Sequence, residues 1–283
     1  MGTGSGIIRR LLAVAAVAAI CLLVQGCVRR PHYVNDATRP VGRTVRPTPP
    51  RPTPPDPVNP VPAPKPPVNP VPGPTPAPAP HSSEAWTAAE LAKANTAADV
   101  DYLTEVEKQA LMYTNLARLD GQKFLDICLN EWMNGPHNYW IKEDNPYVRS
   151  LRQDLAKVKN RTMLQPNPRL AEAADVHAAD LGPTGHISHD STDGTPCFER
   201  ISRYYYANSI GENIASGDED PLTMICLLLI DSGVESLGHR KNIVSVMFNE
   251  VGIGYAPMPG IGYVMVQDFG GSITGTRLFH KKK

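Results

Sequence analysis

The sequence predicts an α+β domain that follows an export signal and a long proline-rich segment. Apolar residues recur at helical spacing in several stretches between residues 104 and 181. The pattern then changes to two short β-type runs, residues 250–255 and 262–267, on either side of a turn. The first 81 residues have a composition that cannot build a core, so we expect one domain over residues 82–283 rather than two.

Residues 1–26 are typical of a bacterial export signal. Arg9 and Arg10 precede an apolar run, residues 11–24, that ends just before Gly26-Cys27. Such a run spans about 21 Å as a helix, short of the roughly 30 Å of a hydrocarbon core, which favours a cleaved signal over a permanent span. Cys27 after a small residue resembles a lipobox, so we expect Cys27 to be lipidated and to anchor the exported protein to the cell-envelope membrane. Ordinary signal cleavage and release to the outside is the alternative.

Residues 27–81 form a predicted linker. Residues 40–80 hold 19 of the 29 prolines, and the sequence of residues 57–62 is repeated at 67–72. Proline fixes φ and donates no hydrogen bond, so we expect an extended polyproline-II stalk of about 125 Å, at roughly 3.1 Å per residue.

The charge and the cysteines of residues 82–283 limit which partners and which disulfides this domain can have. Residues 82–283 hold 19 basic and 26 acidic residues, a net charge of minus seven, which argues against nucleic acid as a partner. Cys128, Cys197 and Cys226 allow one disulfide and a free thiol, or no disulfide, and the sequence does not select a pair. The apolar surroundings of Cys226 predict a buried thiol.

The predicted elements follow in chain order. A helix is expected over residues 104–118, capped by Thr104 with Glu107 three residues on, and a long helix over 168–181 begins with a proline. Two more helices are expected between them, at 124–132 and 148–158. The apolar run 222–230 indicates a buried helix, with a central strand as the alternative. The two runs after residue 250 predict an antiparallel hairpin.

Three short segments carry the strongest functional signal, because each places an ionisable side chain beside a glycine. They are Ser188-His189 with Asp193-Gly194, then Gly211-Glu212-Asn213-Ile214-Ala215, then Gly238-His239-Arg240-Lys241-Asn242-Ile243. In this order and spacing they resemble the CAP superfamily, the family of cysteine-rich secretory, antigen 5 and pathogenesis-related 1 proteins. The resemblance covers about residues 103–270, includes Asn115 and Arg118, and implies an α-β-α sandwich.

The resemblance also implies a cleft and its residues. His189 and His239 are the expected ligands of a divalent cation, zinc by preference, and Glu212 is the expected polarising carboxylate. Asn213 is expected beside them as a scaffold residue, and Asp231 is the candidate for a fourth, acidic member. The competing interpretation is a buried hydrogen-bond network with no ligand. His177 is expected to pack in the core and His186 to lie on the surface.

These residues lead to two functional hypotheses. The first is a binding module whose cleft accepts a small apolar molecule or lipid, a wall glycan or another wall-derived component, or a partner protein. The second is a metal-dependent, peptidase-like hydrolase in which Glu212 is the catalytic general base. The sequence has no Gly-x-Ser-x-Gly, His-Glu-x-x-His or phosphate-binding-loop motif, and we expect a binding module rather than an enzyme.

Overall fold

The structure, a computed structural model, describes residues 27–29, 85–135, 141–217 and 219–271. The predicted export signal and nearly all of the predicted linker lie outside the described residues. The helices are α2 (Ala88–Ala94), α3 (Glu105–Leu119), α4 (Gly121–Phe124), a π-helical turn (Leu125–Leu129), α5 (Asn130–Asn134), α6 (Pro146–Leu155), α7 (Pro168–Leu181), a 3-10 turn (Gly182–Thr184), α8 (Cys197–Ser202), α9 (Pro221–Ile230) and α10 (Gly238–Val244). The strands are β1 (Cys27–Arg29), β2 (Gln165–Pro166), β3 (Ser209–Gly217), β4 (Glu250–Met258) and β5 (Gly262–Gly271).

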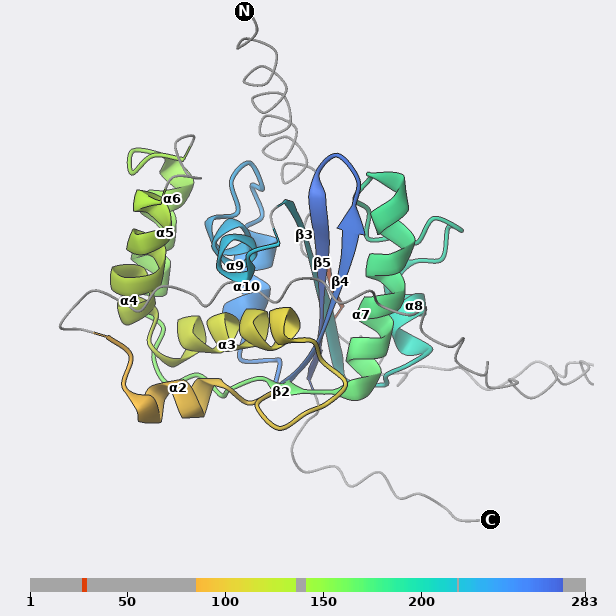
Figure 1. Cartoon of the computed structure of the whole chain (residues 1–283), viewed down its shortest axis with the longest axis horizontal. Helices are drawn as coiled ribbons and strands as arrows, with labels where there is room; N and C mark the ends of the chain where they lie inside the picture. The colour runs from red at the N-terminus through yellow and green to blue at the C-terminus, as the bar shows by residue number, and fades with distance from the viewer. Residues whose placement is uncertain (1–26, 30–84, 136–140, 218, 272–283) are drawn as a thin grey trace, which may run out of the picture. The chain divides into compact units, whose positions relative to one another are not determined.

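The domain has three layers (Figure 1). A central sheet separates α7 and α8 on one face from α3, α9, α10 and the remaining helices on the other. Its strand order is β1-β3-β5-β4-β2. Strands β3, β4 and β5 are antiparallel neighbours, and Glu212 stands directly opposite Asp268 in their register. This arrangement agrees with the predicted α-β-α sandwich.

Most predicted helices are present with small shifts of their ends. Helix α3 begins after Thr104, which forms the expected capping box with Glu107. Helix α7 has the predicted bounds, because Asn167 caps its first turn and Pro168 occupies its first position. The run at 222–230 is a helix and not a strand. No helix in the described part of the chain combines the length and apolar character needed to cross a bilayer.

Three of the predicted bounds need correction. The helix predicted at 124–132 is the central part of a longer helical stretch that runs from α4 through the π-helical turn to α5. The one predicted at 148–158 ends earlier, at Leu155. Both hairpin strands extend beyond their predictions, so that Pro257 and Met258 lie in β4 and not in the turn.

Residues of β3 alternate between the two faces of the sheet. Ile214 packs with apolar residues of α7, and Ile210 packs with Cys197 and Ile201 of α8. The next residue after Ile214, Ala215, packs instead in the main core with α9. Because the side-chain period of a strand is two, Glu212 shares the α7–α8 face with Ile210 and Ile214, whereas Asn213 faces the layer of α3, α9 and α10.

Helix α7 lies directly on β4 because β4 has glycines under it. A Cβ atom at Gly252 would come within 2.0 Å of the backbone nitrogen of Ala171, and one at Gly254 within 2.5 Å of the backbone of Ala174. The glycines of the Glu250–Gly254 segment thus permit a close helix–sheet approach. This packing fixes α7, which in turn carries His177 to the sheet face that holds Glu212.

Candidate functional site

The predicted site residues come from four separate elements. His189 lies in the loop between α7 and α8, Glu212 and Asn213 are neighbours on β3, Asp231 ends α9, and His239 is in the first turn of α10. In the structure, four of these residues form two histidine–carboxylate pairs. His189 pairs with Glu212, and His239 pairs with Asp231.

Glu212 is the centre of the first pair and is fully buried. Its Oε1 is 2.6 Å from Nδ1 of His189 and 3.3 Å from Sγ of Cys197. Its Oε2 accepts a short hydrogen bond from the guanidinium of Arg200 and lies 4.0 Å from Nε2 of His177. A buried carboxylate requires such partners, since an unpaired buried charge is very costly.

The charge of Glu212 is set by these partners. Burial by itself would raise its pKa, but the hydrogen bond from His189 and the positive charge of Arg200 outweigh burial and lower the pKa below its ordinary value. Glu212 is therefore ionised at neutral pH and only accepts hydrogen bonds. It follows that Nδ1 of His189 carries the proton of the bond between them.

Asp268 is a buried acid of this site that the sequence interpretation missed. It stands directly opposite Glu212 across the β3–β5 pair and is fully buried. Burial and the nearby charge of Glu212 raise its pKa well above the ordinary value. Neither of its oxygens has a hydrogen-bond partner in the described part of the chain. A protonated Asp268 avoids a second buried charge beside Glu212 and can donate to its carboxylate.

His177 also belongs to this cluster. The prediction that it packs in the core is confirmed, since it is fully buried, but it packs on Glu212 rather than among apolar side chains alone. Its Nε2 is 2.9 Å from the carbonyl oxygen of Ser188, so Nε2 donates to it. Burial lowers the pKa of His177, which favours the neutral ring.

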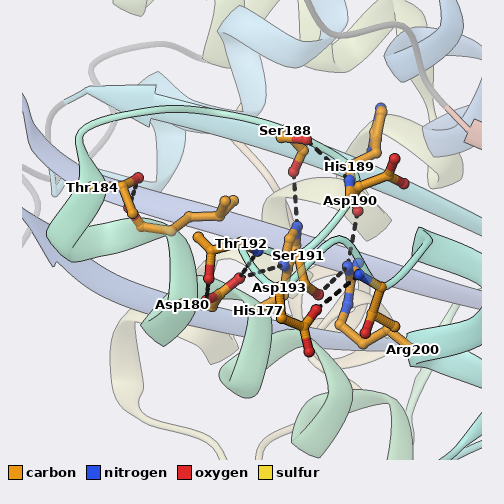
Figure 2. A network of polar contacts seen from close by, with 12 residues as sticks. His177, Asp180, Thr184, Ser188, His189, Asp190, Ser191, Thr192, Asp193 and Arg200 are labelled. Atoms are coloured by element: carbon orange, nitrogen blue, oxygen red, sulfur yellow. Dashed lines mark hydrogen bonds and ion pairs between the residues drawn. The ribbon is translucent and has the colours of Figure 1, made fainter.

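The loop that presents His189 is held by polar contacts (Figure 2). Arg200 donates to the carbonyl of His189 at 2.8 Å and to the hydroxyl of Ser191 at 3.3 Å. Asp180 of α7 accepts from the backbone nitrogen of Thr192 at 2.8 Å and from its hydroxyl. Arg200 thus holds both the loop and Glu212, and His189 remains the partly exposed member, with 18% of its side chain accessible.

The second pair lies at the junction of α9 and α10. Nδ1 of His239 is 2.7 Å from Oδ1 of Asp231, and Oδ2 of Asp231 accepts a hydrogen bond from the backbone N–H of Arg240 at 3.2 Å. Both Asp231 (φ 60°) and Leu237 (φ 51°) have left-handed backbone conformations, which are unfavourable for residues with a Cβ. These two turns bring Asp231 to His239, although the glycines between them interrupt any continuous helix.

Asn213 connects the two pairs as a scaffold residue. Its amide donates to the carbonyl of His239 at 3.2 Å. Asn242 donates to the carbonyl of Glu212 at 3.2 Å and to the side-chain oxygen of Asn213 at 2.9 Å. Asn213 therefore anchors β3 to the backbone of α10, as expected of a scaffold residue. Asn242, from the third sequence segment, anchors α10 to the backbone of β3. The Glu212 side chain points away from these contacts, toward α7 and α8.

The residues present fit a cation. In each pair a carboxylate holds Nδ1, the arrangement that commonly orients Nε2 of a histidine toward a metal. Nε2 of His239 is buried and has no hydrogen-bond partner in residues 85–135, 141–217 and 219–271. Within the same ranges, His189, Cys197 and Glu212 also form one group of potential ligand atoms within 4.8 Å of one another, and His239 is not in that group.

The remaining sequence predictions have simple outcomes. Cys128, Cys197 and Cys226 are all buried free thiols, so none of the disulfides that the sequence allowed is formed among them. The prediction for Cys226 is confirmed, and burial raises the pKa of its thiol. His186 is exposed, as expected. The place of Cys197 beside Glu212 was not predicted, because nothing in the local sequence around residue 197 indicates which strand it faces.

Comparison with known proteins supports the family prediction for part of the chain. Residues 137–269 match the model of CAP, the cysteine-rich secretory protein family. The uncharacterized protein YkwD of Bacillus subtilis (strain 168) is 30% identical over 108 residues, which are 38% of each protein, so the chain spans well under half of that relative.

Two solved structures share part of the chain at low similarity. An extracellular protein containing a SCP domain from Bacillus anthracis str. Ames is 24% identical with a TM-score of 0.34, covering 44% of this chain and 37% of that one. An outer surface protein from Borrelia burgdorferi is 22% identical with a TM-score of 0.35, covering 47% of this chain and 97% of that one. The family match begins later than the predicted resemblance and leaves out α3 with Asn115 and Arg118; within residues 137–269, which hold both histidine–carboxylate pairs, the chain matches the CAP family.

Proposed function

We propose that this protein is an exported CAP-type binding module whose ligand contacts His189. One observation carries the proposal: a fully buried ion pair, Glu212 with Arg200, lies behind a histidine that is partly exposed. The ion pair fixes the ring through Nδ1, and the loop contacts of Arg200 fix its backbone. A rigid imidazole at the surface suits recognition, because little conformational entropy is lost when a ligand binds.

The surroundings of His189 favour a polar ligand. Ser188, Asp190, Ser191, Thr192 and Asp193 flank it, so the loop offers hydroxyl and carboxylate groups and few apolar side chains. We therefore favour a wall-derived, hydrogen-bonding ligand, such as a wall glycan, over a small apolar molecule, a lipid or a partner protein. A divalent cation, zinc by its preference for histidine nitrogen, would be held by His189 together with Cys197 and Glu212 and not jointly with His239, and it would supply a positive charge for such a ligand.

Export and anchoring are part of the proposal and depend on the sequence. The predicted signal at residues 1–26 directs export, Cys27 is the proposed lipidation site, and the proline-rich segment 27–81 is the proposed spacer between membrane and domain. A wall-derived ligand fits this placement, since the domain would stand away from the membrane surface.

The hydrolase hypothesis is the weaker of the two. A general base works best with a pKa near the working pH, and it must reach the water that it activates. Glu212 has a lowered pKa, is fully buried, and uses both oxygens in contacts with His189, Cys197 and Arg200. These features suit a structural carboxylate that holds its neighbours rather than a catalytic base.

The test combines metal analysis with binding to purified cell-wall fragments. We expect His189→Ala to lower wall binding at least tenfold, and His186→Ala, an exposed histidine three residues away, to leave it unchanged. Zinc content should fall in His189→Ala and stay unchanged in His239→Ala, because His239 lies outside the group of close ligand atoms. Wall binding that survives His189→Ala would refute the proposal, and chelator-sensitive hydrolysis of the fragments would favour the enzyme instead.

A further inference from the structure

In the part of the chain that the structure describes, three residues from a distant segment cover the outer edge of β3. Strand β1 (Cys27–Arg29) pairs with it in antiparallel register, with Cys27 opposite Glu212, Val28 opposite Gly211 and Arg29 opposite Ile210. Without β1, β3 would be the last strand on that side of the sheet. An uncovered edge presents backbone N–H and C=O groups that readily accept another strand.

We propose that the edge of β3 at Ile210–Glu212 is a binding site for an extended peptide, which adds to the sheet as a short antiparallel strand. The inference goes beyond the function proposed above, because the edge binds through backbone groups and does not need the ring of His189. Strand addition of this kind gives affinity through main-chain hydrogen bonds and specificity through the side chains at alternate positions.

The pairing of β1 does not come from a hairpin. Residues 30–84 separate β1 from the first described residue of the domain, so the segment reaches the edge as a tethered ligand does. Residues 27–29 cannot pair with β3 while the stalk proposed above holds Cys27 at the membrane and away from the domain, so anchoring would vacate the edge. A separate peptide with the same backbone geometry can then occupy it.

The edge of β3 that pairs with β1 is short, and a side chain of α10 lies at one end of it. Asn242 of α10 donates to the carbonyl of Glu212 and, through the same amide nitrogen, to Asn213, and thus lies over the strand where the pairing with β1 stops. Ile210 and Glu212 have 8% and 0% of their surface exposed because their side chains pack against α8, so the edge offers a ligand mainly its backbone groups. A ligand needs only about three residues in register.

The register predicts which side chain the ligand needs. Residues directly opposite each other in an antiparallel pair lie on the same face of the sheet. The face around Glu212 already holds Arg200, Cys197 and His177, so the ligand residue opposite Glu212 must be small and uncharged. In this chain a cysteine stands at that register position.

The test uses the full chain with prolines at the paired positions. Proline lacks the N–H that a strand donates. In an antiparallel ladder either residue 28 or residues 27 and 29 donate, so Val28→Pro and Arg29→Pro together cover both cases. Val34→Pro is the matched control, because it places the same residue beyond the paired segment.

The two readouts are amide hydrogen exchange at residues 210–212 and binding of a labelled synthetic peptide. The peptide has the sequence of residues 25–31 with serine at position 27. We expect at least one of the two proline variants, but not Val34→Pro, to lose protection at the edge and to bind the peptide at least tenfold more tightly than wild type. A second peptide with tryptophan at position 27 should bind at least tenfold more weakly than the first.

Three outcomes would overturn the inference: unchanged exchange in both proline variants, exposed edges that do not bind the peptide, or equal binding of the serine and tryptophan peptides. Wall binding measured on the same variants separates this inference from the proposed function. If wall binding depends on His189 while the peptide fails to bind, the proposed function stands and the peptide site does not.

Discussion

Arg118 should be one of the most sensitive positions in the protein, although it belongs to neither histidine–carboxylate pair. It is fully buried, and five hydrogen bonds join its guanidinium to four backbone carbonyls, those of Thr162, Ile243, Ser245 and Phe248. In the described part of the chain no carboxylate forms a salt bridge with it. Burial, together with the charge of Arg161, lowers its pKa to about 10, so it stays charged at neutral pH.

The substitution Arg118→Lys keeps the charge and removes the planar fork. An ammonium has three donors on one nitrogen and cannot reach carbonyls that lie around a guanidinium. We expect at least two of the four carbonyls to lose their partner, at about 1–3 kcal/mol each, which gives a loss of about 2–6 kcal/mol. Such a loss is a large fraction of the 5–15 kcal/mol that typically stabilises a domain.

Urea unfolding followed by circular dichroism measures this loss as a change in midpoint at constant slope. Arg203→Lys is the matched control, because Arg203 is exposed and pairs with exposed Glu199; its effect should stay within about 0.5 kcal/mol. A loss below about 1 kcal/mol for Arg118→Lys would refute the argument, because it would mean that the carbonyls find other partners at no cost.

Three further predictions concern the sheet. Wild type should lose stability as pH falls below 4.5, because the lowered pKa of Glu212 in the folded state contributes stability only while the carboxylate is ionised. Glu212→Gln should remove this contribution to the pH dependence. The stability of Asp268→Asn relative to wild type should be higher at pH 7 than at pH 4. The folded wild type has a raised Asp268 pKa and loses stability as pH rises, and the variant removes this loss. Gly252→Ala should cost about 1–3 kcal/mol in urea unfolding by displacing α7. A flat stability difference across pH, or a neutral Gly252→Ala, would contradict them.

Local signals in the sequence predicted those parts of the fold that local interactions determine. The bounds of α7 follow from Asn167 and Pro168, and the start of α3 follows from Thr104 and Glu107, which are all neighbours in the sequence. Strand β3 was not predicted as a strand. Nearly all of its residues are buried on both faces, and polar Glu212 and Asn213 occupy opposite faces, so no apolar alternation marks it.

The candidate site was predicted as a set of residues but not as a geometry. Sequence order could not show that Glu212 meets Asp268, which is far along the chain and becomes its neighbour only through the register of β3 and β5. Nor could it show that Asp231 meets His239, because that contact depends on two left-handed residues without a glycine at either position. Whether a metal or ligand binds there stays a prediction.

In both histidine–carboxylate pairs a carboxylate oxygen contacts Nδ1 of the ring, but the two carboxylates are held in place differently. Glu212 is held by its strand and balanced by the charge of Arg200, whereas Asp231 is held by a strained turn and receives a backbone N–H. The hydrogen bonds of Asn213 and Asn242 connect them through the backbone of β3 and α10. A shift of α10 therefore acts on the Glu212 pair through these amides, which explains why asparagines accompany Glu212 and His239 in the sequence segments that define the site.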